Sequence, residues 1–350
     1  MNAAHHLTYL QAVVIGLIQG LTELLPVSSL GHTVLIPSWL GGSWAALVRQ
    51  EDSGESPYLA FIVGLHLATA LVLIGYYWRE WLRLARGLIT SVARRQVETP
   101  EQRLAWLIVI ATIPVGLAGL KFEHAFRVLF ARPAAAAVFL MINGGILLLA
   151  ERYRRRGRIP VPAGGAGPPD DQDQEDAPVS MAAAATTTGT PAGTGQEQRG
   201  ARRPRPGRPR PERAVVDAAA EQRLAGIGAG SALWIGAAQI LALFAGISRE
   251  GVTMAGGLVR GLSHEDALRF AFLLSTPVIL AAGALKVPDL TGPLGAGIRG
   301  QVLAGSVAAA ATSLLAIVFL ARWFRTRTLT PFAVYCLAAG LLSLIRFTIW

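Results

Sequence analysis

Long runs of apolar residues constrain this chain more than any other feature. Seven of them are about 17 to 23 residues long, which is enough for a helix to cross a hydrocarbon core of roughly 30 Å. They run from Tyr58 to Trp78, Leu104 to Leu120, Pro133 to Ala150, Leu224 to Phe244, Ala267 to Lys286, Gln301 to Trp323 and Pro331 to Ile349. Only 15% of the residues are charged, against roughly 25% in soluble domains. The pattern predicts an all-α polytopic membrane protein and argues against a soluble enzyme.

The net charge of +10 indicates membrane topology rather than nucleic-acid binding. Residues 151–223 hold 13 of the 32 Lys+Arg and 10 of the 22 Asp+Glu. From its Gly-, Pro- and Ala-rich composition, this segment is predicted to be a disordered cytoplasmic linker. Most other basic residues lie between apolar runs, as they do on the cytoplasmic side of membrane proteins. We therefore expect no nucleic-acid partner and a multi-pass protein of the inner (plasma) membrane.

Two apolar stretches are interrupted by polar residues and turn-formers. The first, within residues 7–47, contains ELLPVSSLGH, and the second, between Phe244 and Ala267, contains GISREGVTMAGG. Backbone that leaves a helix at membrane depth is tolerated only where protein or a water-filled cavity satisfies its polar groups. A shift of 220 aligns the two stretches without gaps, with seven identities over the nineteen positions 15–33. We interpret the match as an internal repeat whose two hairpins form a site.

The basic loops give the two repeats opposite orientations. Loops 79–103 and 322–327 and the linker are rich in arginine and are assigned to the cytoplasm, whereas the acidic loop 49–56 is assigned to the outside. Residues 1–150 then form a re-entrant hairpin plus three spans, and residues 224–350 form the same unit inverted. The predicted fold is an inverted repeat of six transmembrane helices plus two re-entrant helical hairpins, a plan in which broken helices meet near the midplane.

Few ionisable groups lie at membrane depth, where they are costly unless they face a cavity or a partner. They are Glu23, His32, His66, Arg249 and Glu250. Glu23 has an alternative as a structural ion-pair partner of Arg249. His66 is expected to be a satisfied interior histidine rather than a catalyst, and the sequence does not decide whether Glu250 belongs to the site.

The first hairpin supplies acid/base and nucleophilic groups. Gln19 and Glu23 are four residues apart and therefore share a helix face. Ser28, Ser29 and His32 follow in the turn and the start of the returning helix. Ser28 has the alternative of a capping role within the turn.

The second hairpin supplies an anion cradle. Ser248, Arg249 and Thr253 surround a glycine-flanked turn at an expected helix N-terminus, where amide groups, hydroxyls and a guanidinium suit phosphate. Phosphoryl transfer needs this division of labour, because its catalysis is mostly positioning and charge stabilisation.

The segments GLIQGLTELLPVSSLGH and GISREGVTMAGG resemble the two signature regions of the bacterial undecaprenyl-diphosphate phosphatase family, which is associated with bacitracin resistance. The first family motif, Glu or Gln followed four residues later by Glu, is met by Gln19 and Glu23. The serine and histidine that follow it fall on Ser29 and His32.

The second family motif, Pro-Gly-x-Ser-Arg-Ser with a downstream threonine, is matched at Gly246, Ser248, Arg249 and Thr253. It departs at Ala245, where the family usually has proline, and at Glu250, where it usually has serine. The resemblance covers nearly the whole chain apart from the linker.

The resemblance implies hydrolysis of undecaprenyl diphosphate, a polyprenyl diphosphate lipid, to undecaprenyl phosphate for reuse in cell-wall assembly. The implied catalytic residues are Glu23, Ser29, His32 and Arg249, and the implied substrate-binding residues are Gln19, Ser28, Ser248 and Thr253. Glu23 is also the expected ligand of a divalent cation, Mg²⁺ or Ca²⁺.

The sequence leaves several alternatives open. Ser29 is the expected nucleophile with His32 as proton carrier, but water could attack directly. The chain could instead be a polyprenyl-phosphate flippase or transporter, since inverted repeats with broken helices also occur there. A catalytically weakened relative and a homodimer are left open too.

Overall fold

The computed structural model describes residues 7–49, 57–130, 132–157, 212–292, 295 and 297–349. Within these ranges the regular structure is helical, without a strand, which confirms the all-α prediction. The elements before the large gap are α1 (Tyr9–Leu24), α2 (Ser29–Leu40), α3 (Gly42–Arg49), α4 (Pro57–Tyr76), α5 (Trp78–Arg94), α6 (Pro100–Phe130) and α7 (Pro133–Gly157). Those after it are α8 (Glu212–Ala225), α9 (Ala229–Ala238), the 3₁₀ helix η2 (Gln239–Leu243), α10 (Arg249–Val259), α11 (His264–Thr291), α12 (Arg299–Trp323) and α13 (Thr330–Ile349).

Five helices in the described part of the chain are long and apolar enough to cross a membrane, and two bent helix pairs raise the number to seven. The five lie in α6, α7, α11, α12 and α13. Their outward faces expose large apolar side chains, among them Leu120, Leu303 and Leu342. A soluble protein would rarely tolerate so much exposed apolar surface. The chain is therefore a multi-pass membrane protein.

Helix α5 replaces the plain loop that was expected over residues 79–103. It turns away from α4 by 85° and carries its arginines and its leucines on different faces. Amphipathic helices of this kind lie along a membrane surface rather than across it. Buried Glu80 of α5 bonds Arg269 of α11 at 2.7 Å, and Arg83 contacts Glu221 of α8. These ion pairs fix α5 to the second half of the chain.

The predicted linker, residues 151–223, is too long at both ends. Helix α7 continues to Gly157, because buried Glu151 pairs with His264 at 2.8 Å and anchors the last turns. Helix α8 begins at Glu212, and its Arg223 holds Asp266 of α11 at 2.8 Å. Residues 158–211 lie outside the described part of the structure, so there the linker stays a prediction.

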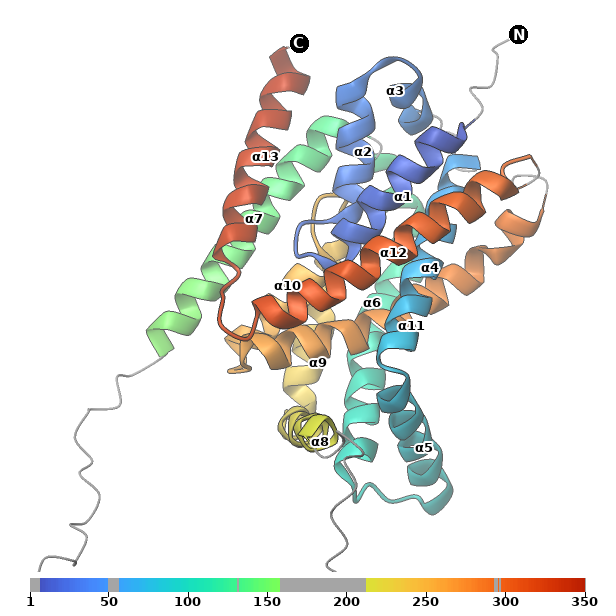
Figure 1. Ribbon diagram of the computed structural model, residues 1–350. Helices are drawn as coiled ribbons and strands as arrows, with labels where there is room; N and C mark the ends of the chain where they lie inside the picture. The colour runs from blue at the N-terminus through green and yellow to red at the C-terminus, as the bar shows by residue number, and fades with distance from the viewer. Residues whose placement is uncertain are drawn as a thin grey trace, which may run out of the picture.

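Each hairpin packs against a helix of the other half of the chain. Figure 1 shows α1 beside α12, and α9 packs against α6 in the same way. The contacts are made by Gly16 of α1 and Gly236 of α9, which the shift of 220 had aligned. A Cβ atom on Gly16 would stand 2.3 Å from the carbonyl oxygen of Gly305, and one on Gly236 would stand 2.1 Å from that of Ala111. Small residues at these crossings are what let the backbones approach so closely.

We predict that Gly16→Ala and Gly236→Ala each lower the free energy of unfolding by about 1 to 3 kcal/mol, because the added methyl group collides with backbone. Gly75→Ala in α4 is the matched control, since a Cβ there meets nothing within 4 Å. Thermal unfolding in detergent, followed by tryptophan fluorescence, measures the difference. Equal midpoints for all three variants would contradict the close approach.

Candidate active site

The two hairpin turns have the same construction. Ser28 caps α2 by accepting the Gly31 amide at 3.2 Å, and Ser248 caps α10 by accepting the Gly251 amide at 3.1 Å. These serines are equivalent under the shift of 220. Ser28 also has a φ of 70°, a left-handed conformation that is costly for a residue with a Cβ. The chain holds it there because its hydroxyl is used in more than one bond.

The turns bond each other reciprocally. The Gly246 amide donates to Ser28 Oγ at 3.1 Å, and Ser248 Oγ donates to the Leu25 carbonyl oxygen at 3.2 Å. Both hydroxyls are therefore engaged in holding the turns together. The capping alternative for Ser28 is what the structure shows, and Ser248, predicted to bind substrate, has the same structural task.

Asn143 of α7 ties the two turns a second time, and sequence reasoning missed it. Its amide nitrogen donates to the Pro26 carbonyl oxygen at 3.0 Å, and its Oδ1 accepts the Ser248 amide at 3.0 Å. The side chain is fully buried. A signal was present, because an amide inside an otherwise apolar run is costly at membrane depth unless it has partners.

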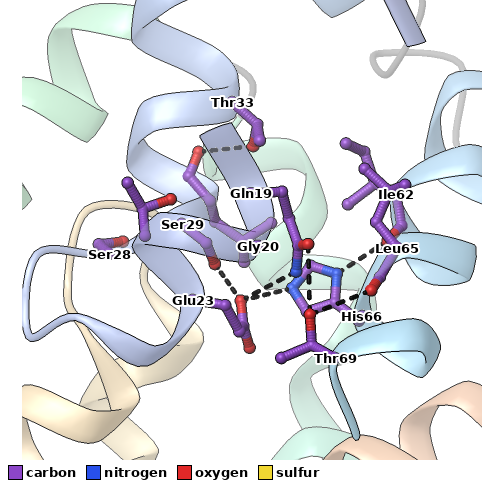
Figure 2. A network of polar contacts seen from close by, with 12 residues as sticks. Gln19, Gly20, Glu23, Ser28, Ser29, Thr33, Ile62, Leu65, His66 and Thr69 are labelled. Atoms are coloured by element: carbon purple, nitrogen blue, oxygen red, sulfur yellow. Dashed lines mark hydrogen bonds and ion pairs between the residues drawn. The ribbon is translucent and has the colours of Figure 1, made fainter. Parts of the chain in front are cut away.

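Glu23 lies at the centre of a buried polar cluster (Figure 2). Its Oε2 accepts the Ser29 hydroxyl, lies 3.1 Å from Nε2 of His66 and receives a longer contact of 3.4 Å from Gln19 Nε2. The Gln19 Oε1 in turn faces Thr69 of α4 at 3.4 Å. The structure thus brings three predicted residues, Gln19, Glu23 and Ser29, into direct contact.

His66 belongs to this cluster, and both of its ring nitrogens have partners, as expected for a satisfied interior histidine. Its Nδ1 lies 2.8 Å from the Ile62 carbonyl oxygen, while Nε2 faces the Glu23 carboxylate. Both partners are acceptors, so the His66–Glu23 pair must hold a proton between Nε2 and Oε2. The alternative pairing of Glu23 with Arg249 is not found as an ion pair within the described residues.

The second hairpin presents polar atoms that have no partner in the described part of the chain. They are Nη1 of Arg249, Oγ1 of Thr253 and both side-chain polar atoms of Gln239, and all of these atoms are buried. Arg249 lies close enough to Glu23, His66 and Glu250 to interact with each electrostatically. Buried polar groups without a partner cost free energy. Their presence in the second hairpin indicates a place for a polar ligand, and Gln239 adds a residue that was not predicted.

Glu250 has a hydrogen-bond partner in α11. Its Oε1 accepts the Ser275 hydroxyl at 2.8 Å, and the side chain is buried. The carboxylate therefore lies beside the cluster with a partner of its own.

His32 is placed differently from its prediction. Its Nδ1 lies 2.7 Å from the Ser28 carbonyl oxygen, its Nε2 lies 2.7 Å from the Tyr335 hydroxyl, and its ring stacks on that of Tyr335. Both ring nitrogens are thus engaged away from Ser29. The stacked Tyr335 ring and the Ser28 carbonyl oxygen fix the imidazole in this position.

Glu23 is the expected ligand of the predicted divalent cation. No group of three or more His, Cys, Asp or Glu side chains that could hold a metal is found in the described ranges. Mg²⁺, however, is often bound through one or two carboxylates together with substrate phosphates and water. The contacts of Glu23 described above all fall on Oε2, so Oε1 can serve as one such ligand.

The arrangement can perform one kind of chemistry well. A hydroxyl hydrogen-bonded to a carboxylate is poised to lose its proton, and a nearby guanidinium can hold a phosphate. Serine, carboxylate and guanidinium come from two hairpins whose turns are bonded together.

Comparisons with known proteins agree with this chemistry. Residues 12–189 and 209–342 match the family model described as bacitracin resistance protein BacA. The chain is 53% identical over 349 residues to undecaprenyl-diphosphatase 2 of Frankia alni, with 99% of each chain covered. It is 49% identical over 340 residues to the undecaprenyl-diphosphatase of Mycolicibacterium paratuberculosis, with 97% of each covered. A more distant relative, the undecaprenyl-diphosphatase of Granulibacter bethesdensis, is 35% identical over 336 residues, with 95% of this chain and 94% of the relative covered.

Proposed function

Because the chain belongs to the bacitracin resistance protein BacA family, we propose that it hydrolyses undecaprenyl diphosphate to undecaprenyl phosphate and inorganic phosphate. The observation that carries the proposal is the hydrogen bond from the Ser29 hydroxyl to the Glu23 carboxylate, with the Arg249 guanidinium close by. A flippase or transporter for a lipid phosphate needs a phosphate-binding group but has no use for that hydroxyl–carboxylate pair.

Substrate binding is assigned to the second hairpin. Arg249 holds the terminal phosphate through its unpartnered Nη1, and Thr253 and Gln239 bond further phosphate oxygens through their unpartnered atoms. A guanidinium suits this task because its donors match the spacing of phosphate oxygens. Ser28 and Ser248 contribute by shaping the turns, since their hydroxyls are already engaged.

The chemical step begins with Glu23 taking the proton of Ser29. The Ser29 Oγ forms a bond to the terminal phosphorus, and the bond from that phosphorus to the bridging oxygen breaks, which releases undecaprenyl phosphate. Water then hydrolyses the phosphoserine and inorganic phosphate leaves. In the second version of the step Glu23 takes the proton from water, and water attacks the phosphorus directly.

His66 positions the base. It holds the Glu23 carboxylate toward Ser29 while its own ring is fixed by the Ile62 carbonyl oxygen. His32 remains a prediction as a proton carrier, and its hydrogen bonds lead to Tyr335 and the Ser28 carbonyl oxygen.

Glu23 would hold a divalent cation through its carboxylate. When bound, it would neutralise part of the negative charge that the transferring phosphoryl group carries.

The proposed topology keeps six transmembrane helices and two re-entrant hairpins. Helices α4, α6 and α7 are the three spans of the first half, and α11, α12 and α13 are those of the second. The α1–α2 and α9–α10 hairpins enter from opposite sides, which is supported by the contact between their turns. The membrane is the inner (plasma) membrane, where polyprenyl carriers for the cell wall are used.

The function is tested by phosphate release from undecaprenyl diphosphate with the purified protein. We expect activity in the wild type, its loss on chelation of divalent cations, and a drop of about 10² to 10⁴ in kcat/KM for Glu23→Gln and Arg249→Ala. Arg260→Ala, at the end of the same helix α10, is the matched control and should stay near wild type. No release by wild type in any cation would favour a transporter or a weakened relative.

The nucleophile is tested by Ser29→Ala. We expect a fall of about 10³ in kcat, since the variant lacks the attacking oxygen, and a phosphoserine on Ser29 in quenched wild-type reactions. Ser38→Ala is the control within α2, because among the described residues Ser38 bonds only the Val34 carbonyl oxygen of its own helix. Full activity in Ser29→Ala would mean that water attacks directly.

His66 is tested by replacing its ring with an amide or an alkyl group. His66→Leu should lower kcat by about tenfold to a hundredfold with little change in KM, because Glu23 loses the donor that orients it. His66→Gln restores a donor and should recover part of the rate. If both variants fall equally, or if KM rises instead of kcat falling, His66 does not position the base.

A further inference from the structure

A basic hollow lies apart from the candidate active site and shares no lining residue with it. It has a volume of about 610 Å³ and is formed by the end of α7, the α10–α11 connection and the α12–α13 connection. Figure 1 shows the α12–α13 connection beside α7. Three arginines line the hollow, Arg154, Arg325 and Arg327, against one carboxylate, Glu265. The wall therefore carries a net positive charge.

Arg154 is held rigidly in this wall. Its guanidinium lies 3.4 Å from Glu151, which also contacts His264 at 2.8 Å, and the His264 ring stacks on Phe324. The Nε of Arg154 is buried and has no hydrogen-bond partner among the described residues. Arg154 is therefore anchored at the wall by Glu151, with one further donor unused among the described residues.

The other two arginines carry unneutralised charge. Arg325 and Arg327 are exposed, and neither has a carboxylate within ion-pair distance in the described part of the chain. Three guanidiniums that converge on one hollow suit a phosphate group, which accepts several charge-assisted hydrogen bonds.

An apolar groove continues from the basic hollow. It also has a volume of about 610 Å³, and it shares Thr326 and Arg327 with the first hollow. Its wall is the outward face of α12, with Leu314, Leu315 and Phe319 exposed at 47%, 67% and 46%. A soluble anion would leave this groove unused, whereas a lipid places its headgroup in one hollow and a chain in the other.

We propose that the two hollows together bind one anionic phospholipid from the leaflet that faces the arginine-rich loops. The phosphate lies among Arg154, Arg325 and Arg327, and an acyl chain lies along Leu315 and Phe319. Basic pockets between transmembrane helices recognise anionic headgroups in this way. The site is independent of the phosphatase chemistry proposed above, so either assignment can fail without the other.

The test is native mass spectrometry of the purified full chain with phosphatidylglycerol or phosphatidylcholine of identical acyl chains. We expect wild type to retain phosphatidylglycerol preferentially, and Arg325→Gln/Arg327→Gln to bind it about tenfold or more weakly. Arg86→Gln/Arg94→Gln, which removes two exposed arginines from α5, is the control of equal charge and should bind like wild type. Circular dichroism checks that all variants keep their helix content.

Two chainless anions, inorganic phosphate and glycerophosphoglycerol, complete the experiment as competitors. Weak competition by both supports a lipid that uses the groove. Displacement of phosphatidylglycerol by inorganic phosphate at comparable concentration would overturn the proposal in favour of a soluble anion site. Equal retention of the two phospholipids, or an equal loss in the α5 control, would overturn it as well.

Discussion

The structure depends on satisfying the backbone of two turns that lie inside a membrane protein. Both turns are buried, so their polar backbone groups need partners from the protein itself. Partners cross between the turns: Ser28 accepts the Gly246 amide, Ser248 donates to the Leu25 carbonyl oxygen, and Asn143 of α7 bonds both turns. This mutual satisfaction brings the acid–hydroxyl pair of the first hairpin near the guanidinium of the second. The hydrogen bonds that satisfy the two turns thus also bring the reacting groups together.

Much of the fold is readable in the sequence because membrane depth leaves few choices. Runs of apolar residues long enough to span a bilayer must be helices, and arginines between them mark the ends. Helix α5 could not be predicted in this way. Its arginines and leucines lie on different faces of the helix and therefore do not form one apolar run. The ends of the linker could not be predicted either, because the ion pairs that extend α7 and α8 join residues far apart in the chain.

The candidate site was predictable where neighbours in sequence are neighbours in space. Two of the predicted residues, Gln19 and Glu23, lie on α1, and Ser29 begins α2. Gln19 and Ser29 both contact the Glu23 carboxylate. His66 and Asn143 come from other helices, and no spacing within the hairpins points to them. His32 follows Ser29 closely in sequence, but its Nε2 lies beside the Tyr335 hydroxyl of α13, a long-range contact that spacing within the hairpin does not predict.

The packing of α1 on α12, through Gly16 and Gly305, has a consequence for how the protein is made. Helix α1 is synthesised well before its partner α12, because α2 to α11 lie between them in the chain. The first hairpin must therefore wait in the bilayer with its glycine face uncovered and the backbone of its turn still without the amide of Gly246. Helices α6 and α9 meet earlier, which makes the second hairpin the natural template on which the first closes. Because each hairpin packs on a helix of the other half, the two hairpins are completed at different times during synthesis.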